Sequence, residues 1–145
     1  MAQKKTAQQT VDGVAGRAVT LRKQVHDQLT SANVLKQIER MAPQGSPTGE
    51  QFVRVVLSEI GRNEVLLQCS PRSIIRACYE AASLGLMING VLGHAYLVPY
   101  LGKTKAAQLI IGYRGLVELA MRSGKLRQVG AELVHANDSL TFAKG

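Results

Sequence analysis

The residues best suited to chemistry in this sequence are cations grouped toward its end. Residues 103–127 contain six of them and a single acidic residue, Glu118. The six are Lys103, Lys105, Arg114, Arg122, Lys125 and Arg127. Such a group is typical of surfaces that bind nucleic-acid phosphates, although it also occurs as a solvated basic face. Arg122 and Lys125 have a structural explanation as well, since a helix C-terminus favours cations, whereas Lys103 and Lys105 have none.

Three tyrosines lie in the same region, and their rings could add base stacking to phosphate binding. Tyr96, Tyr100 and Tyr113 occur close to the cations along the chain. Aromatic rings in such positions stack on nucleobases or pack into a hydrophobic core, and the sequence leaves both open.

Other chemistry finds little support. Gly102-Lys103-Thr104 has the ending of a phosphate-binding P-loop, but the first glycine of that motif would fall on Leu97, and a strand pattern follows where the motif requires a helix. The ten carboxylates include no close pair, and the three histidines have no metal-ligand spacing. We therefore predict no enzyme activity and no metal site.

Composition narrows the class of protein further. The 145 residues are 46% hydrophobic and carry a net charge of +8, so the chain is long enough for one domain with a sizeable core and favours an anionic partner, nucleic acid or a membrane surface. Two cysteines are too few for a disulfide framework, and residues 1–20 lack a signal-peptide pattern, which favours the cytoplasm. The uncharged stretch 81–102 is broken by glycines and a proline, so we expect no membrane span.

Local patterns predict helices followed by a hairpin. Residues 1–17 are polar and without apolar period, which predicts a disordered tail before a single domain at 18–145. Helices are expected over 18–41 with a break at Ser31–Asn33, from Thr48 to about Gly61, and from Ser70-Pro71 to a glycine cap at Gly85.

The pattern then changes to that of strands. Residues 93–101 and 106–113 form a predicted hairpin whose tip carries Lys103 and Lys105, and Pro99 indicates an edge strand or a bulge. A helix over 113–123 with an apolar face of Leu116, Val117, Leu119 and Ala120 follows, then a strand over Leu126–His135. The predicted fold class is α+β: helices packed on a small antiparallel sheet.

Several of these segments together resemble one known family. They are Cys69-Ser-Pro-Arg-Ser-Ile-Ile-Arg-Ala77, Ala82-Ser-Leu-Gly-Leu86, Gly93-His-Ala-Tyr-Leu-Val-Pro-Tyr100 and Ile110-Ile-Gly-Tyr-Arg-Gly-Leu-Val-Glu-Leu-Ala-Met-Arg-Ser-Gly124. In combination, they make the chain similar to the RecT family of phage single-strand annealing proteins, from about Val34 onward.

The resemblance implies ATP-independent pairing of DNA strands in homologous recombination. It implies single-stranded DNA and annealed duplex as ligands, assembly into rings or helical filaments, and a partner 5′–3′ exonuclease. No cofactor is expected, with Mg²⁺ at most assisting annealing. On this interpretation the candidate DNA contacts are the six cations and Tyr113, whereas Gly112, Gly115 and Gly124 would permit close backbone approach or end a helix.

Members of the family continue beyond the segment that aligns here. The sequence is therefore expected to be the N-terminal portion of a longer protein and an incomplete domain, in which the strand at Leu126–His135 lacks a neighbour. Two alternative functions stay open. The chain could be an assembly module without annealing activity that uses residues 81–102 to oligomerise, or, on the weaker evidence of Gly102-Lys103-Thr104, a nucleotide hydrolase.

Overall fold

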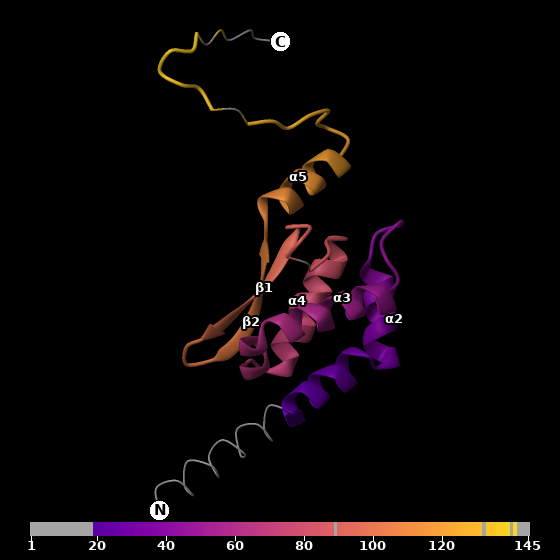
Figure 1. Ribbon diagram of the computed structural model, residues 1–145. Helices are drawn as coiled ribbons and strands as arrows, with labels where there is room; N and C mark the ends of the chain where they lie inside the picture. The colour runs from indigo at the N-terminus through magenta and orange to yellow at the C-terminus, as the bar shows by residue number, and fades with distance from the viewer. Residues whose placement is uncertain (1–18, 89, 132, 140, 142–145) are drawn as a thin grey trace, which may run out of the picture.

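The computed structural model describes residues 19–88, 90–131, 133–139 and 141. Within these residues the chain forms a layer of helices, a two-stranded sheet and one further helix, in that order (Figure 1). The predicted α+β class is confirmed. The predicted tail at residues 1–17 lies outside the described residues.

The helical layer follows the apolar periodicity closely. Residues 19–29 are helical, and the chain breaks at Thr30 and Ser31, close to the predicted break. The helices that follow are α2 (Ala32–Met41), α3 (Gly49–Arg62), the short 3₁₀ helix η1 (Glu64–Gln68) and α4 (Pro71–Ser83).

Side chains cap these helices where the sequence predicted it. The Thr48 hydroxyl accepts a hydrogen bond from the Gln51 amide, and the Gln51 side chain accepts one from the Thr48 amide, which completes a capping box at the start of α3. Ser70 caps α4, with Pro71 in the first turn. Gly85 follows the end of α4 with φ of +63°, a conformation that glycine adopts without strain.

The sheet is an antiparallel hairpin of β1 (Ala95–Leu101) and β2 (Lys105–Ile111). Its register runs without a bulge from the pair Ala95 and Ile111 to the pair Leu101 and Lys105. Pro99 lies in an edge strand opposite Ala107, in agreement with one of the two predicted settings. Alternation along the strands gives the hairpin an inner face, with Ala95, Leu97 and Ala107 buried, and an exposed outer face.

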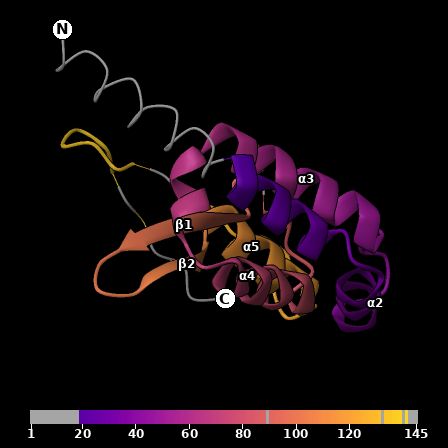
Figure 2. The same ribbon diagram turned by 90° about the horizontal axis from the view of Figure 1, so that it is seen from below.

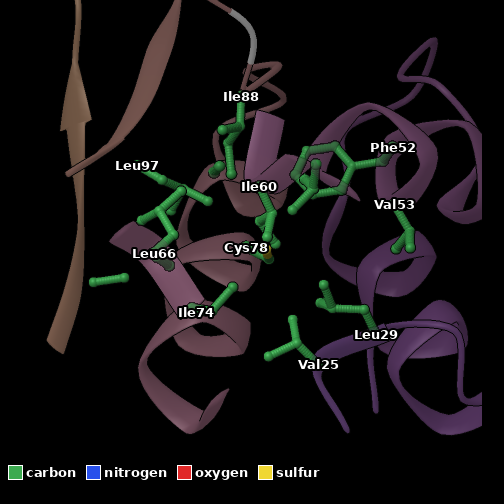
Figure 3. Packing of buried hydrophobic residues seen from close by; sticks show 14 of the residues in the cluster. Val25, Leu29, Phe52, Val53, Ile60, Leu66, Ile74, Cys78, Ile88 and Leu97 are labelled. Carbon is green, nitrogen blue, oxygen red and sulfur yellow. The ribbon is translucent and has the colours of Figure 1, made fainter. Parts of the chain in front are cut away.

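The core lies between the helices and this inner face (Figure 3). Its most deeply buried large side chains come from every helix of the layer and from the segment before β1: Val25, Leu29, Ile38, Val56, Leu66, Ile74, Cys78, Leu86 and Ile88. The Cys78 thiol is fully buried, and burial raises its pKa to about 12. Cys69 is also buried, and both thiols are free.

The uncharged stretch 81–102 folds as the end of α4, a loop and β1. Across the described part of the chain, no helix is both long and apolar enough to cross a membrane.

Helix α5 (Tyr113–Arg122) follows the hairpin and ends near Gly124, which has φ of +69°. Its predicted apolar face is only partly correct. Leu119 packs against the core, but Leu116 is 56% exposed, and Gly115 is the only fully buried residue of the helix. Leu116 stays exposed because no helix or strand of the described chain packs extensively against α5.

The predicted strand at Leu126–His135 is wrong for the described residues of that segment. Residues 126–131 and 133–135 have no strand hydrogen bonding, are all exposed, and extend away from the helical layer (Figure 1). A strand requires a neighbour to take up its hydrogen bonds, and no described segment pairs with this one. Its apolar side chains are consequently exposed, Leu133 at 87%.

Candidate nucleic-acid interface

The hairpin tip carries the first group of predicted contacts. Lys103 lies in the loop 102–104, and Lys105 begins β2; both are exposed. The carbonyl oxygen of Lys105 accepts a hydrogen bond from the Ser70 amide at 3.0 Å, which joins the tip to the first turn of α4. The charge of Lys105 also acts on the Cys69 thiol, although burial dominates and raises the pKa of Cys69.

Arg72 belongs to the first turn of α4, which the hairpin tip contacts, and is absent from the sequence-based candidates. It is exposed and lies two residues after Ser70, whose amide contacts Lys105. A charge count along the chain does not find it, because Arg72 lies 33 positions before Lys105 in the sequence. Pairing of the start of α4 with the start of β2 could have been inferred only from tertiary contacts.

The other end of the hairpin holds Arg114 and Tyr113 in the first turn of α5. The Arg114 Nε donates a hydrogen bond to the Tyr113 hydroxyl at 3.0 Å, and the guanidinium carbon lies 5.8 Å from the centre of the Tyr113 ring. The hydrogen bond to the Tyr113 hydroxyl is the main cause that raises the pKa of Arg114. Tyr113 itself is 71% exposed.

Tyr96 lies beside this pair. A Cβ atom at Gly93 would come within 3.1 Å of the Tyr96 hydroxyl and within 3.3 Å of the Arg114 Cδ. Gly93 therefore has Tyr96 and Arg114 as direct neighbours, and the absence of a side chain there lets the two approach. Tyr96, Tyr113 and Arg114 together form a small exposed group of two rings and one cation.

The outer face of the hairpin connects the two ends. Tyr96, Tyr100 and Ile110 lie on it and are each 39–46% exposed. The rings therefore do not pack into the core of the described chain, which removes one of the two interpretations that the sequence left open for Tyr96 and Tyr100. What remains is an exposed aromatic surface between two groups of cations.

Arg122 has a different environment from the other candidates. Its Nη1 donates a hydrogen bond to the Leu84 carbonyl oxygen at 2.8 Å, and its Nη2 contacts Glu118 Oε1 at 3.2 Å. This guanidinium is thus engaged with protein acceptors. Lys125 and Arg127, by contrast, are exposed in the segment after α5, and their side chains make no hydrogen bond or ion pair within the part of the chain that the structure describes.

The structure therefore separates the six predicted cations into groups at different places. Each strand has seven residues, and the six steps between its first and last residue make the hairpin about 20 Å long at about 3.3 Å per residue. Lys103 and Lys105 lie at one end of this length and Arg114 at the other, as the positions of the hairpin loop and α5 indicate (Figure 1). Viewed from below, both strands and the loop lie on the opposite side of the molecule from α2 (Figure 2).

Other kinds of site lack support among the described residues. Gly102-Lys103-Thr104 forms the predicted hairpin tip and leads into β2, so it is not followed by the helix of a P-loop. No three His, Cys, Asp or Glu side chains within the described residues group as metal ligands would.

Comparison with known proteins assigns this arrangement to a family. A sequence model of the RecT family matches residues 50–145, two thirds of the chain, which includes both groups of cations and the aromatic face between them. The chain belongs to the RecT family.

Two curated relatives are similar to this chain. Protein RecT of Escherichia coli (strain K12) is 38% identical over 103 residues, which cover 68% of this chain and 38% of the relative. Uncharacterized protein YqaK of Bacillus subtilis (strain 168) is 33% identical over 110 residues, which cover 76% of this chain and 37% of the relative. The chain therefore spans less than two fifths of the length of either.

Proposed function

We propose that this chain binds single-stranded DNA and promotes pairing of complementary strands in recombination, without ATP. The observation that carries the proposal is the exposed aromatic face of the hairpin with Lys103 and Lys105 at one end and Tyr113 and Arg114 at the other. Membership of the RecT family supports the same function.

The chemistry of annealing fits such a surface. Two DNA strands repel each other through their phosphates, so a protein that pairs them must neutralise that charge. It must also hold bases where a second strand can test them, which exposed rings do by stacking. The 20 Å hairpin matches about six phosphates of one strand at the spacing of about 3.4 Å that the strand has in a duplex. Neither step requires a catalytic side chain or a nucleotide cofactor, with Mg²⁺ at most assisting by screening phosphates.

Assembly is part of the same proposal. A footprint of about six nucleotides is too short to hold long strands in register, so several copies in a ring or helical filament would act on one DNA strand together. A 5′–3′ exonuclease partner would supply the single strands.

Reversal of the charge at the hairpin tip tests the proposal. Lys103→Glu with Lys105→Glu should strongly weaken binding to a labelled oligonucleotide of mixed sequence, measured by fluorescence anisotropy over a salt series. The matched control is Lys36→Glu with Arg40→Glu, two exposed cations on α2, on the other side of the molecule from the hairpin (Figure 2). The control changes the net charge equally. An equal loss of oligonucleotide binding in both variants would mean that overall charge alone causes it, which would contradict the proposed site.

A second candidate function is an assembly module that does not anneal DNA. The exposure of Tyr100, Ile110 and Leu116 favours it, because exposed apolar surface marks a region that packs against a partner. The same charge-reversal variant separates the two functions, since it should remove oligonucleotide binding and leave the sedimentation behaviour of an assembly module unchanged.

A further inference from the structure

Helix α5 is joined to the rest of the chain at its two ends. At its start, the Gly112 amide donates a hydrogen bond to the His94 carbonyl oxygen at 2.9 Å. A Cβ atom at Gly112 would lie 2.2 Å from the Gly93 oxygen, and one at Gly115 would lie 2.1 Å from the His94 oxygen. The helix therefore rests directly on the backbone before β1, in contacts that only glycine permits.

At the other end of α5, one side chain makes the connection. Arg122 donates to the carbonyl oxygen of Leu84 at 2.8 Å and lies 3.5 Å from that of Gly85. These carbonyls follow α4, where a helix end leaves acceptors without partners. Glu118, one turn earlier in α5, contacts the same guanidinium at 3.2 Å and orients it. A Cβ atom at Gly85 would lie 2.7 Å from the Arg122 Nη1, so the chain makes room for this contact.

We propose that Arg122 is a positioning residue for DNA binding and not a phosphate contact. The inference rests on the proposed function. The nitrogens Nη1 and Nη2 are occupied by Leu84 and Glu118, and the carboxylate of Glu118 would repel a phosphate placed beside it. By fastening the end of α5 to the end of α4, Arg122 holds the first turn of α5 in place. That turn presents Tyr113 and Arg114 next to Tyr96.

The dependence of α5 on this contact follows from its burial. Gly115 alone is fully buried within the helix, and Leu116 is 56% exposed. Leu119 packs against the core, but few other apolar contacts remain to fix the helix once Arg122 is removed. The fraction of molecules with Arg114 correctly placed would then fall, and the apparent Kd would rise by the inverse of that fraction.

The salt dependence of binding distinguishes positioning from contact. Each phosphate contact on a single strand contributes about 0.7 to the slope of log K against log salt. Arg122→Ala should raise the Kd about tenfold if one molecule in ten keeps α5 in place, with the slope unchanged. Arg114→Ala should lower the slope by about 0.7. Arg122→Lys, which keeps one donor for Leu84, should restore part of the affinity, and Lys36→Ala on α2 should change neither quantity.

Two further readouts complete the test. Hydrogen exchange should become faster at residues 113–122 in Arg122→Ala and stay unchanged in α4. Arg114→Ala should raise the Kd by the same factor in the Arg122→Ala background as alone, because the molecules that bind still hold Arg114 against a phosphate.

Specific results would overturn the proposal. A slope in Arg122→Ala that falls as much as in Arg114→Ala would make Arg122 a phosphate contact, and unchanged exchange at α5 would remove the fastening role. If Arg122→Ala unfolds, Glu118→Gln replaces it, because this variant keeps the hydrogen bond from Arg122 to Leu84 and removes only the charge that orients Arg122. Glu118→Gln should give a smaller rise in Kd with the same slope. No rise in Kd would contradict the proposal. Failure of the unaltered chain to bind DNA would contradict the proposed function, and α5 exchange in Arg122→Ala would still decide whether Arg122 holds the helix.

Discussion

The Ser73 hydroxyl accepts a hydrogen bond from the Ala107 amide at 2.9 Å and donates one to the Ser70 carbonyl oxygen at 2.7 Å. Ala107 faces Pro99 in the sheet register, at a position whose amide points away from β1. Ser73 therefore satisfies an amide on the free edge of β2 and attaches the hairpin to the first turn of α4. The place of Lys105 beside α4 follows from this attachment.

Replacement of Ser73 by alanine should destabilise the protein. The Ala107 amide, in a residue only 6% exposed, would lose its partner, which costs about 1–3 kcal/mol. Urea unfolding followed by circular dichroism measures the change. Ser83→Ala is the control, because the exposed Ser83 hydroxyl bonds only within its own helix, to the Glu80 carbonyl oxygen. Equal free energies of unfolding for the two variants would refute the attachment.

Two glycine-to-alanine substitutions should have opposite effects. In Gly115→Ala the new methyl group would meet the His94 backbone oxygen, and overpacking of this kind costs about 1–3 kcal/mol. In Gly61→Ala the methyl group meets nothing within 4 Å in helix α3, so the better helix propensity of alanine should stabilise the protein by about 0.5–1 kcal/mol. Thermal unfolding of the two variants checks both signs, and a destabilised Gly61→Ala protein would conflict with this packing.

Stability should fall at high pH because of Cys78. Burial raises the pKa of its thiol from 9.0 to about 12, so above pH 9 the unfolded chain binds fewer protons than the folded one. The contribution of Cys78 is fully present below pH 9 and is lost as pH rises toward 12, with a limiting slope of about 1.4 kcal/mol per pH unit. Urea unfolding at pH 8 to 10.5 should show this decline. Cys78→Ala should reduce it without abolishing it, since burial also raises the pKa of Tyr79. An equal fall in stability in the unaltered chain and in Cys78→Ala would mean that a group other than Cys78 causes it.

Aromatic stacking on the hairpin should contribute to DNA binding independently of charge. Tyr100→Ala should weaken binding to single-stranded DNA by about 1–3 kcal/mol, the range for one stacked base, with an unchanged salt slope. Tyr100→Phe keeps the ring and should bind almost normally. Anisotropy titrations over a salt series measure both effects. Normal binding by Tyr100→Ala would favour the assembly function for this face.

Local signals predicted much of the fold. The caps at Thr48 and Ser70, the glycine at Gly85 and the change to a strand pattern all act over a few neighbouring residues, and each lies where the sequence indicated. Local signals could not predict whether Leu126–His135 forms a strand, because a strand exists only when another segment pairs with it. The exposure of Leu116 likewise depends on what packs against α5 from elsewhere in the chain.

Only part of the candidate site could be predicted from the sequence. The cations at 103–127 are neighbours along the chain, but the hairpin separates Lys103 from Arg114 by its full length. Arg72 lies in the turn of α4 that contacts the start of β2, and Arg122 is engaged with an acceptor 38 residues earlier. A charge count contains neither relation, because both arise from tertiary packing.

We propose that this chain pairs complementary DNA strands through its basic and aromatic hairpin face. The direct measurement adds two complementary labelled oligonucleotides one after the other to the protein, without ATP, over a salt series, and follows duplex formation by energy transfer. We expect pairing to be faster than in the protein-free control, the acceleration to fade as salt rises, and the acceleration to be lost in Lys103→Glu with Lys105→Glu. Pairing no faster than the control at any salt concentration, with the strands bound, would contradict it.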